Sequence, residues 1–439
     1  MLKVILVKGL VQLISLMALL SFVPIIVNAK TVYNIDRISP EGVLTLSMLL
    51  PTKDIDQKLV VRGGDWGLKP QIDSVQCEGI LLQQITTYEW LLPKGCQQVI
   101  WRVTPTDVRY GDADASKQST IFIANADDNK KTILLSEPTS LLRIVNDNAG
   151  TISSSPEVKM YGAKVDGRQS WSVPEYNKAP EFYLVGDFTV QESYFGNMNS
   201  HYFSDNVTLT SELKLNQYHQ EVLGYLTKAL SITPQESGDN ELLVIWLGSN
   251  EKNKFIGGAA GGRSFVANYL YGDDNNIQLN NAKTQLVMAH EQFHQLIDMI
   301  RGNKPSQPTW IEEGLAQYYG FKSLKQTENN PELVSQIGNV VVPSNVSVKH
   351  TFMALDKQFK AGDRSVYPEF YSQGAIFWHK LDSILSEAAK NHSGLDPFVV
   401  ELMTSPPEEN GDLPEKIKTK MIEIGGEPVN SLFQQYIGQ

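Results

Sequence analysis

Two histidines four residues apart, with a glutamate directly after the first, are the residues of this chain best suited to chemistry. They lie in residues 290–294, which read HEQFH and match the pattern H-E-x-x-H. Positions i and i+4 of a helix share one face, so His290 and His294 can bind one metal ion from the same side. Glu291 then lies beside a metal-bound water whose proton it can take. Glu313, which follows His294 after 18 intervening residues, can complete three protein ligands and leave one position open. This layout predicts one catalytic Zn²⁺ per chain.

Two helices must position these side chains. Apolar residues recur at helical spacing around the motif and predict a helix over about 283–300, which Gly302, Pro305 and Pro308 end. The second helix is expected to begin at Thr309, with Thr309 as N-cap and Glu312 completing a capping box. This assignment leaves Glu313 free to face the first helix. Asp298, one turn after His294, is a candidate acceptor for a ligand histidine, although the pattern favours an ordinary solvated helix residue.

The chain resembles the gluzincin metallopeptidases, in particular the aminopeptidase N and glycyl aminopeptidase families. The resemblance rests on the 18-residue gap, on the segment 310–319 (WIEEGLAQYY) and on 371–375 (YSQGA). The last segment is similar to the Tyr-x-Lys-Gly-Ala of these families, with Gln373 in place of the lysine. The resemblance implies that Glu313 is the third zinc ligand and that Tyr371 donates a hydrogen bond to the oxyanion of the tetrahedral intermediate. An aromatic ring packed at the start of a helix is the alternative for Tyr371.

A glycine-rich segment precedes the motif, between an apolar strand at 242–247 and a further strand at 265–271. It reads IGGAAGGRSF over 256–265. The resemblance implies that Gly257, Gly258 and Ala259 belong to an edge that hydrogen-bonds an extended peptide. In the related families this stretch carries a glutamate that captures the amino terminus of the substrate, and here it carries no acid. Endopeptidase action, or another source of the anion, is therefore favoured, and a flexible hairpin turn is the alternative for the glycines.

The N-terminal segment and the two cysteines of the chain indicate export. Residues 1–29 read as a secretory signal peptide, with Lys3 and Lys8 before an apolar run from Leu10 to Val27. Cleavage predicts a periplasmic or secreted protein, whereas an uncleaved segment would anchor it to a membrane. The even count of two cysteines in an exported chain favours one disulfide between Cys77 and Cys96, with two buried free thiols as the alternative.

The charge of the chain gives no reason to expect a nucleic-acid partner. The formal net charge is −11 for the whole sequence, from 38 basic and 49 acidic residues. Removal of residues 1–29 takes away two lysines and leaves 36 against 49, or −13. An acidic exported protein repels a polyanion, and we interpret the charge as a source of solubility.

The pattern along the chain predicts an α+β protein. Short apolar or alternating runs at 43–49, 59–61, 99–103 and 120–123 predict a β-rich N-terminal part over 30–180, interpreted as an antiparallel sandwich. Residues 145–180, rich in Ser, Gly, Pro and Asn, are expected to connect this part to the C-terminal one. Residues 181–439 are expected to form a thermolysin-like zincin catalytic domain with a helical C-terminal part. Its clearer helices are predicted at 208–230, 371–385 and 413–424.

The leading functional hypothesis is an exported zinc metallopeptidase acting on a peptide or protein in an extended form. One alternative from another class is an inactive gluzincin-like module that binds a peptide or protein. A second is a zinc hydrolase that acts on another amide or an ester. A third keeps aminopeptidase specificity and supplies the missing anion from residues outside the glycine-rich segment.

Overall fold

A computed structural model describes residues 30–50, 55–108, 110–124, 131–145, 147–162, 170–232, 241–250, 256–272, 276–302, 304–344, 347–389 and 394–438. The predicted signal peptide, residues 1–29, lies outside the described residues. Residues Thr31–Gln439 form one compact unit. Within the described ranges, no helix combines the length and the apolar character needed to cross a membrane.

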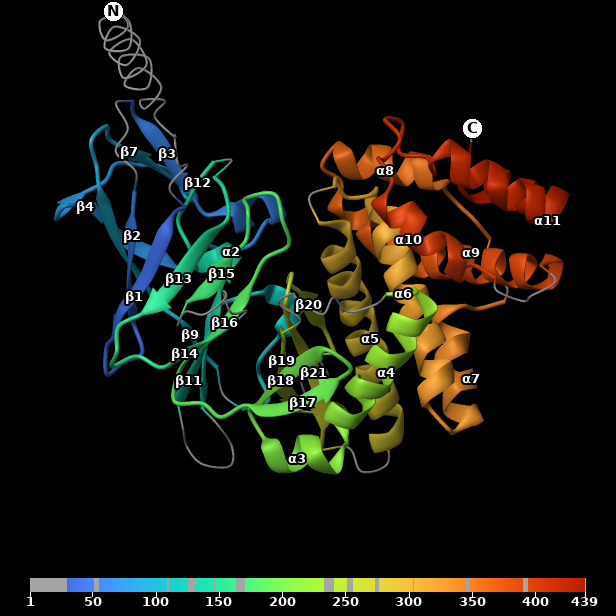
Figure 1. Cartoon of the computed structure of the whole chain (residues 1–439), viewed down its shortest axis with the longest axis horizontal. Coiled ribbons are helices and arrows are strands. Elements are labelled where there is room, and N and C mark those ends of the chain that lie inside the picture. The colour runs from blue at the N-terminus through green and yellow to red at the C-terminus, as the bar shows by residue number, and fades with distance from the viewer. Residues whose placement is uncertain are drawn as a thin grey trace, which may run out of the picture. The chain divides into compact units, whose positions relative to one another are not determined.

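The strands of the N-terminal part are divided among three sheets (Figure 1). A seven-stranded sheet has the order β15 (Trp171–Val173), β13 (Gly150–Ser154), β1 (Val32–Ile38), β2 (Leu44–Leu49), β8 (Gln98–Val103), β4 (Ile72–Cys77), β5 (Ile80–Leu81). A four-stranded sheet has the order β12 (Arg143–Ile144), β3 (Gln57–Val60), β7 (Glu89–Leu92), β6 (Gln84–Thr86). A five-stranded sheet has the order β14 (Met160–Tyr161), β16 (Phe182–Gly186), β11 (Lys131–Ser136), β10 (Ile121–Ala124), β9 (Thr106–Val108).

Alternating apolar residues explain the burial of these strands. In β2, Leu44, Leu46 and Met48 are fully buried while Thr45 between them is only partly buried, as the two-residue period of a strand requires. The predicted disulfide is confirmed: Cys77 ends β4 and bonds to Cys96, which lies just before the neighbouring strand β8. The bond therefore ties a strand to the loop that leads into its partner.

Two details of this part differ from the expectation of an antiparallel sandwich followed by a connector. The strands form three sheets, and the pairs β1–β13 and β10–β9 are parallel. The expected connector, residues 145–180, contributes β13, β14 and β15 to the sheets. Its polar composition hides strands that are only two to five residues long. The proposed domain division at residue 180 stays a prediction. Strand β16, which follows residue 180, pairs with β11 and β14, which precede it.

The C-terminal part is built on a second five-stranded sheet, with helices packed on one face (Figure 1). Its strand order is β17 (Gln191–Phe195), β18 (Met198–Ser204), β19 (Glu241–Asn250), β21 (Ser264–Tyr271), β20 (Gly258–Ala260). The helices are α3 (Val207–Glu212), α4 (Leu215–Ala229), α5 (Ile277–Arg301), α6 (Thr309–Thr327), α7 (Pro331–Val341), α8 (Phe352–Lys360), α9 (Tyr367–Ala388), α10 (Asp396–Thr404) and α11 (Glu415–Tyr436). Further short helices are α2 (Glu137–Ser140), η1 (Arg62–Trp66), η2 (Ala115–Lys117) and η3 (Arg364–Val366).

The central strand β19 explains how the two parts join. Eight consecutive residues of β19 are buried, as expected for a parallel strand that is covered on both faces. Leu242, Val244 and Trp246 pack into the helical core. Leu243, Ile245 and Leu247 face the opposite way and pack into a second core that includes Phe182 and Leu184 of β16. The sheet is thus packed between the helices and the β-rich part.

Candidate active site

The metal-ligand candidates converge between α5 and α6. His290 and His294 lie one turn apart on α5, and their Nε2 atoms are 3.1 Å from each other. Oε2 of Glu313, in the second turn of α6, lies 3.3 Å from each of these nitrogens. No other group of three His, Cys, Asp or Glu side chains with metal-binding geometry occurs among the described residues. The residues predicted from the sequence as metal ligands therefore meet at one point.

The spacing of these three atoms fits a zinc ion. Tetrahedral zinc with ligand bonds of about 2.0–2.2 Å places its ligand atoms about 3.3–3.6 Å apart. The observed separations of 3.1, 3.3 and 3.3 Å are close to those edges. The donor set of two imidazoles and one carboxylate is also that of a catalytic zinc, with a fourth position left open. His290, His294 and Glu313 therefore fit a zinc ion.

The electrostatics of the metal-free protein favour a charged pair. Burial alone lowers the pKa of His294, but the Glu313 carboxylate outweighs it and raises that pKa to about 9. Burial opposes the ionised form of Glu313, yet the two histidines hold its pKa well below the ordinary value. Glu313 is thus a carboxylate in the form that binds a cation.

Glu291 lies against the edge strand β20. Its side chain is buried, and burial raises its pKa above the ordinary value. The backbone N–H of Ala260 donates to its carboxylate. A Cβ atom added to Gly258 would lie 2.5 Å from Oε1 of Glu291. Glycine at 258 is therefore what leaves room for the carboxylate at this edge.

The glycine-rich segment lines the cavity that also contains Glu291 and the metal-ligand candidates. The Asn268 N–H donates to the Gly257 carbonyl at 2.9 Å, and Gly258 pairs with Ala267. Hydrogen-bonded and non-hydrogen-bonded pairs alternate along an antiparallel ladder. Because Gly257 and Asn268 form a hydrogen-bonded pair, Gly258 and Ala260 belong to non-hydrogen-bonded pairs. Their backbone N–H and C=O groups therefore point away from β21. Gly258, Ala259 and Ala260 line a cavity together with the metal-ligand candidates, while Gly257 lies outside it beside Ser116. Ala260 is a site residue that the sequence analysis missed.

Tyr371 stacks on His290, with ring centroids 5.4 Å apart and planes 13° apart. Its hydroxyl donates to the hydroxyl of Tyr367 at 3.1 Å, and Tyr367 in turn donates to Oε1 of Glu313 at 2.9 Å. Tyr371 thus lies near the metal-ligand candidates, as predicted. Tyr367 was not predicted, although its position one helical turn before Tyr371 is the signal that could have found it. Gln373, where the related families carry lysine, is buried and donates to the His350 carbonyl.

Glu312 has partners different from those expected, and Asp298 pairs with an arginine. Thr309 is not the N-cap of α6, because Pro308 precedes the helix and supplies no side-chain cap. Glu312 instead accepts from the backbone N–H of Gln307 at 2.7 Å and pairs with Arg301 at 2.7 Å. Proline before the helix and the nearby Arg301 outcompete a capping box. Asp298 also pairs with Arg301, at 3.2 Å, rather than with a histidine. No hydrogen-bond partner for Nδ1 of His290 occurs among the described residues.

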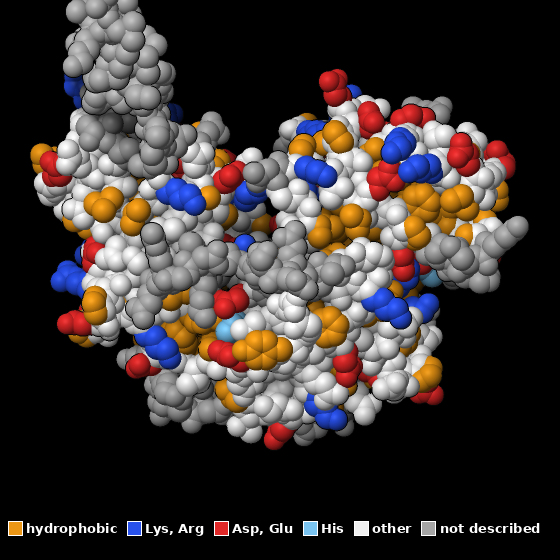
Figure 2. Space-filling view, in the orientation of Figure 1, with side chains coloured by type: hydrophobic (Ala, Val, Ile, Leu, Met, Phe, Trp, Pro, Cys, Tyr) orange, Lys and Arg blue, Asp and Glu red, His pale blue; other side chains and the backbone are white. Residues whose placement is uncertain are grey.

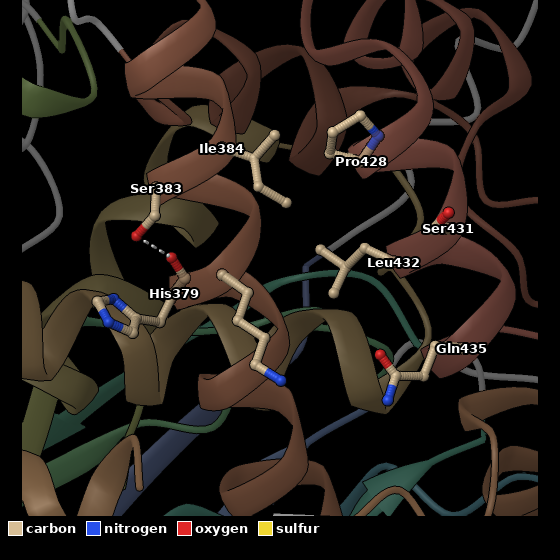
Figure 3. Close-up of a pocket in the computed structure, with 8 residues that line it drawn as sticks. His379, Ser383, Ile384, Pro428, Ser431, Leu432 and Gln435 are labelled. Atoms are coloured by element: carbon tan, nitrogen blue, oxygen red, sulfur yellow. Dashed lines mark hydrogen bonds between the residues drawn. The ribbon is translucent and has the colours of Figure 1, made fainter. Parts of the chain in front are cut away.

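The cavity has a volume of about 1010 Å³ and is walled by both parts of the chain. Helices α5, α6 and α9 supply the motif residues, and η1 of the β-rich part supplies another part of the wall through Gly64, Asp65, Trp66 and the following Gly67 and Leu68. Figure 2 shows a hollow between the β-rich part and the C-terminal helices on the face in view. A smaller cavity of about 380 Å³ between α9 and α11 contains none of the predicted site residues (Figure 3).

A buried ion network anchors η1. Arg62, its first residue, donates to the Glu137 carboxylate from Nε, which lies 2.9 Å from both oxygens, and from Nη2, and Arg143 donates to Oε1 of Glu137 at 2.8 Å. Arg62 also donates to the Tyr176 carbonyl at 2.8 Å. These side chains are almost completely buried. The wall that carries Asp65 is therefore fixed by charges inside the β-rich part.

Only carboxylates that line the cavity could meet a cationic group of a ligand bound there. Glu181 lies behind the glycine turn, where it accepts from Ser264 Oγ at 2.6 Å, and burial raises its pKa to about 7. It does not line the cavity. Besides Glu291 and Glu313, the acids that do line it are Asp65, Asp298 and Glu312.

No protein-family model and no curated protein sequence matches the chain. Solved structures do match. An aminopeptidase N family protein from Idiomarina loihiensis aligns with a TM-score of 0.64 at 14% identity, covering 93% of this chain and 76% of that chain. Aminopeptidase A from Legionella pneumophila, in complex with aspartic acid, aligns with a TM-score of 0.49 at 12% identity, and the match spans about half (49%) of its length. The first likeness establishes the fold: an α+β protein with a β-rich N-terminal part and a helical C-terminal part, as predicted.

Proposed function

We propose that the protein is a zinc-dependent peptidase. The observation that carries the proposal is the convergence of His290, His294 and Glu313 at tetrahedral zinc spacing, beside Glu291 and an open edge strand. These three side chains would hold the ion, one per chain. When bound, zinc supplies an acidified water and a Lewis acid for the scissile carbonyl.

The residues of the chain have separate tasks in this proposal. Glu291 takes the proton of the attacking water and later passes it to the leaving amine, for which a buried carboxylate with a raised pKa is suited. Tyr371 donates to the oxyanion that develops on the substrate. The outward backbone groups of Gly258 and the outward carbonyl of Ala260 hydrogen-bond an extended peptide as an added strand. Peptides and flexible protein segments in an extended form are therefore the proposed substrates.

The absence of an acid from residues 257–262 favours endopeptidase action. Aminopeptidase action is the second candidate, because Asp65, Asp298 and Glu312 line the cavity and could attract the amino terminus of a substrate. We also propose export, on the strength of the sequence of residues 1–29. The periplasm or the exterior of the cell is the expected location, and a membrane is involved only if this segment is retained.

Metal content and one substitution test the proposal. The purified protein, never exposed to chelator, is expected to contain one zinc per chain. Glu291→Gln is expected to keep the zinc and to lose hydrolysis of an internally quenched peptide. A folded sample without zinc contradicts the assignment of the site, and full hydrolysis by Glu291→Gln contradicts the role of Glu291. Persistent zinc binding with no cleavage of a peptide library by the unmodified protein would support the inactive binding module instead.

Two forms of one quenched peptide separate the two specificities. One form has a free amino terminus and the other is acetylated. Equal cleavage of both is expected for an endopeptidase. Loss of cleavage on acetylation supports an aminopeptidase, and Asp65→Asn and Asp298→Asn then identify the carboxylate that binds the ammonium group.

A further inference from the structure

Glu313 has two carboxylate oxygens with different surroundings. Oε2 faces Nε2 of His290 and of His294, both at 3.3 Å. Oε1 accepts the hydrogen bond of Tyr367 at 2.9 Å. The hydroxyl of Tyr367 is itself the acceptor for Tyr371, at 3.1 Å. A chain of two hydroxyls therefore runs from the proposed oxyanion donor to the proposed metal ligand.

We propose that Tyr367 is a positioning residue, which holds Oε1 of Glu313 so that Oε2 remains to bind the metal. This inference rests on the proposed zinc site. Groups that hydrogen-bond a metal ligand fix its orientation, and their removal commonly weakens metal binding about 10–100-fold. A carboxylate has two equivalent oxygens, so a donor to one of them selects the oxygen that remains for the ion.

The close packing of α6 against α9 brings Tyr367 within hydrogen-bond distance of Glu313. Tyr367 and Tyr371 are one turn apart in the first two turns of α9 and share a face. Helices α6 and α9 touch through Gly314 and Gly374: a Cβ on Gly374 would lie 2.6 Å from the Cα of Gly314. Gly314 follows Glu313 directly. Because two glycines meet at the crossing, the helices approach closely enough for the tyrosines of α9 to reach the carboxylate of α6.

The ring of Tyr371 is held independently of this chain of hydroxyls. It stacks on the ring of His290 and also lies edge-on to the ring of Tyr367, with centroids 5.3 Å apart. Rotation about the C–O bond of Tyr371 redirects its hydrogen without moving the ring. The same hydroxyl can therefore donate to Tyr367 in the free protein and to a substrate oxyanion during the reaction, while Tyr367 continues to donate to Glu313.

Zinc affinity of the full chain, measured by competition with a fluorescent zinc chelator, tests the proposal. Tyr367→Phe is expected to weaken zinc binding about 10–100-fold, because Oε1 loses its donor. Tyr371→Phe is the matched control, since it removes the hydroxyl one step further out. It is expected to keep the zinc affinity of the unmodified protein within about twofold and to lower kcat about 10²-fold. In the double variant, the zinc affinity is expected to equal that of Tyr367→Phe alone.

Thermal unfolding of the metal-free variants separates positioning from a general structural effect. Tyr367→Phe is expected to unfold near the temperature of the unmodified protein, and excess zinc is expected to restore most of its kcat. Unchanged zinc affinity in Tyr367→Phe overturns the proposal, as does a loss of kcat that zinc does not repair. If Tyr367→Phe does not fold, Tyr367→Met takes its place with the same expectation. Failure of the unmodified protein to bind zinc would instead refute the proposed function.

Discussion

Gly258→Ala is a sharp test of the geometry around Glu291. The backbone at Gly258 is extended and accepts alanine without strain, so the substitution adds one methyl group to β20 and little else. That methyl group would lie 2.5 Å from Oε1, 2.7 Å from Cγ and 2.9 Å from Cδ of Glu291. All three are shorter than an ordinary van der Waals contact, so the carboxylate or the strand must move.

The size of the displacement can be worked out from these distances. Restoring an ordinary contact of 3.4 Å from 2.5 Å requires a shift of 0.9 Å. Glu291 is buried, and the proposed proton transfer depends on where its carboxylate lies. A misplacement of about 1 Å in a catalytic group costs about 10²-fold in rate. This corresponds to about 2.7 kcal/mol in the activation free energy. We therefore expect kcat/KM of Gly258→Ala to fall about 100-fold while its zinc content stays at one per chain.

Hydrolysis of a quenched peptide by zinc-loaded protein measures the effect. Gly257→Ala is the matched control, because its added methyl group meets Ser116 and not Glu291. It is expected to lose much less activity than Gly258→Ala. Activity of Gly258→Ala close to that of the unmodified protein, or equal losses in both variants, would refute the argument that glycine at 258 makes room for the general base.

Two further predictions concern stability. Replacement of both Cys77 and Cys96 by serine removes a cross-link between positions 19 apart in the sequence. It is expected to lower the free energy of unfolding by about 3 kcal/mol, measured by urea denaturation without reductant. An unchanged midpoint would contradict a structural role. In the metal-free protein, the raised pKa of His294, about 9, and the lowered pKa of Glu313 make their pair fully stabilising between the ordinary values of about 4.5 and 6.5. Its contribution is lost as pH rises through 9 and as pH falls through the pKa of Glu313. The unfolding temperature of the chelated protein is therefore expected to fall from pH 6.5 to 9. Glu313→Gln is expected to flatten this dependence on pH.

The local pattern of the sequence predicted the core of the site well. His290, His294 and Glu291 belong to one helix, so their relative placement follows from helical spacing alone, and α5 extends the predicted 283–300 to Ile277–Arg301. Glu313 required only the next helix to pack on the first. The start of that helix was predicted at the right residue but for the wrong reason, because Glu312 pairs with Arg301 and accepts from the backbone N–H of Gln307 rather than from that of Thr309.

The features that were missed depend on packing between distant segments. The contact between Tyr367 and Glu313 depends on the Gly314–Gly374 crossing, which no pattern within α9 reveals. The three-sheet arrangement depends on pairs such as β1 with β13, whose partners lie far apart in the sequence. Strand pairing of this kind is set by the whole fold rather than by alternation within a strand. The outward direction of Ala260 likewise required the register of β20 against β21.

The η1 turn has a consequence for what the site can receive. A chain that began after β16 would still contain His290, Glu291, His294 and Glu313, yet the cavity beside them would lose the wall that η1 supplies. The ion network of Arg62 holds this wall in place. For the proposed peptidase, a cavity walled by both parts of the chain is expected to admit a single extended strand more readily than a compact domain. Folded proteins are therefore expected to be poorer substrates than extended peptides.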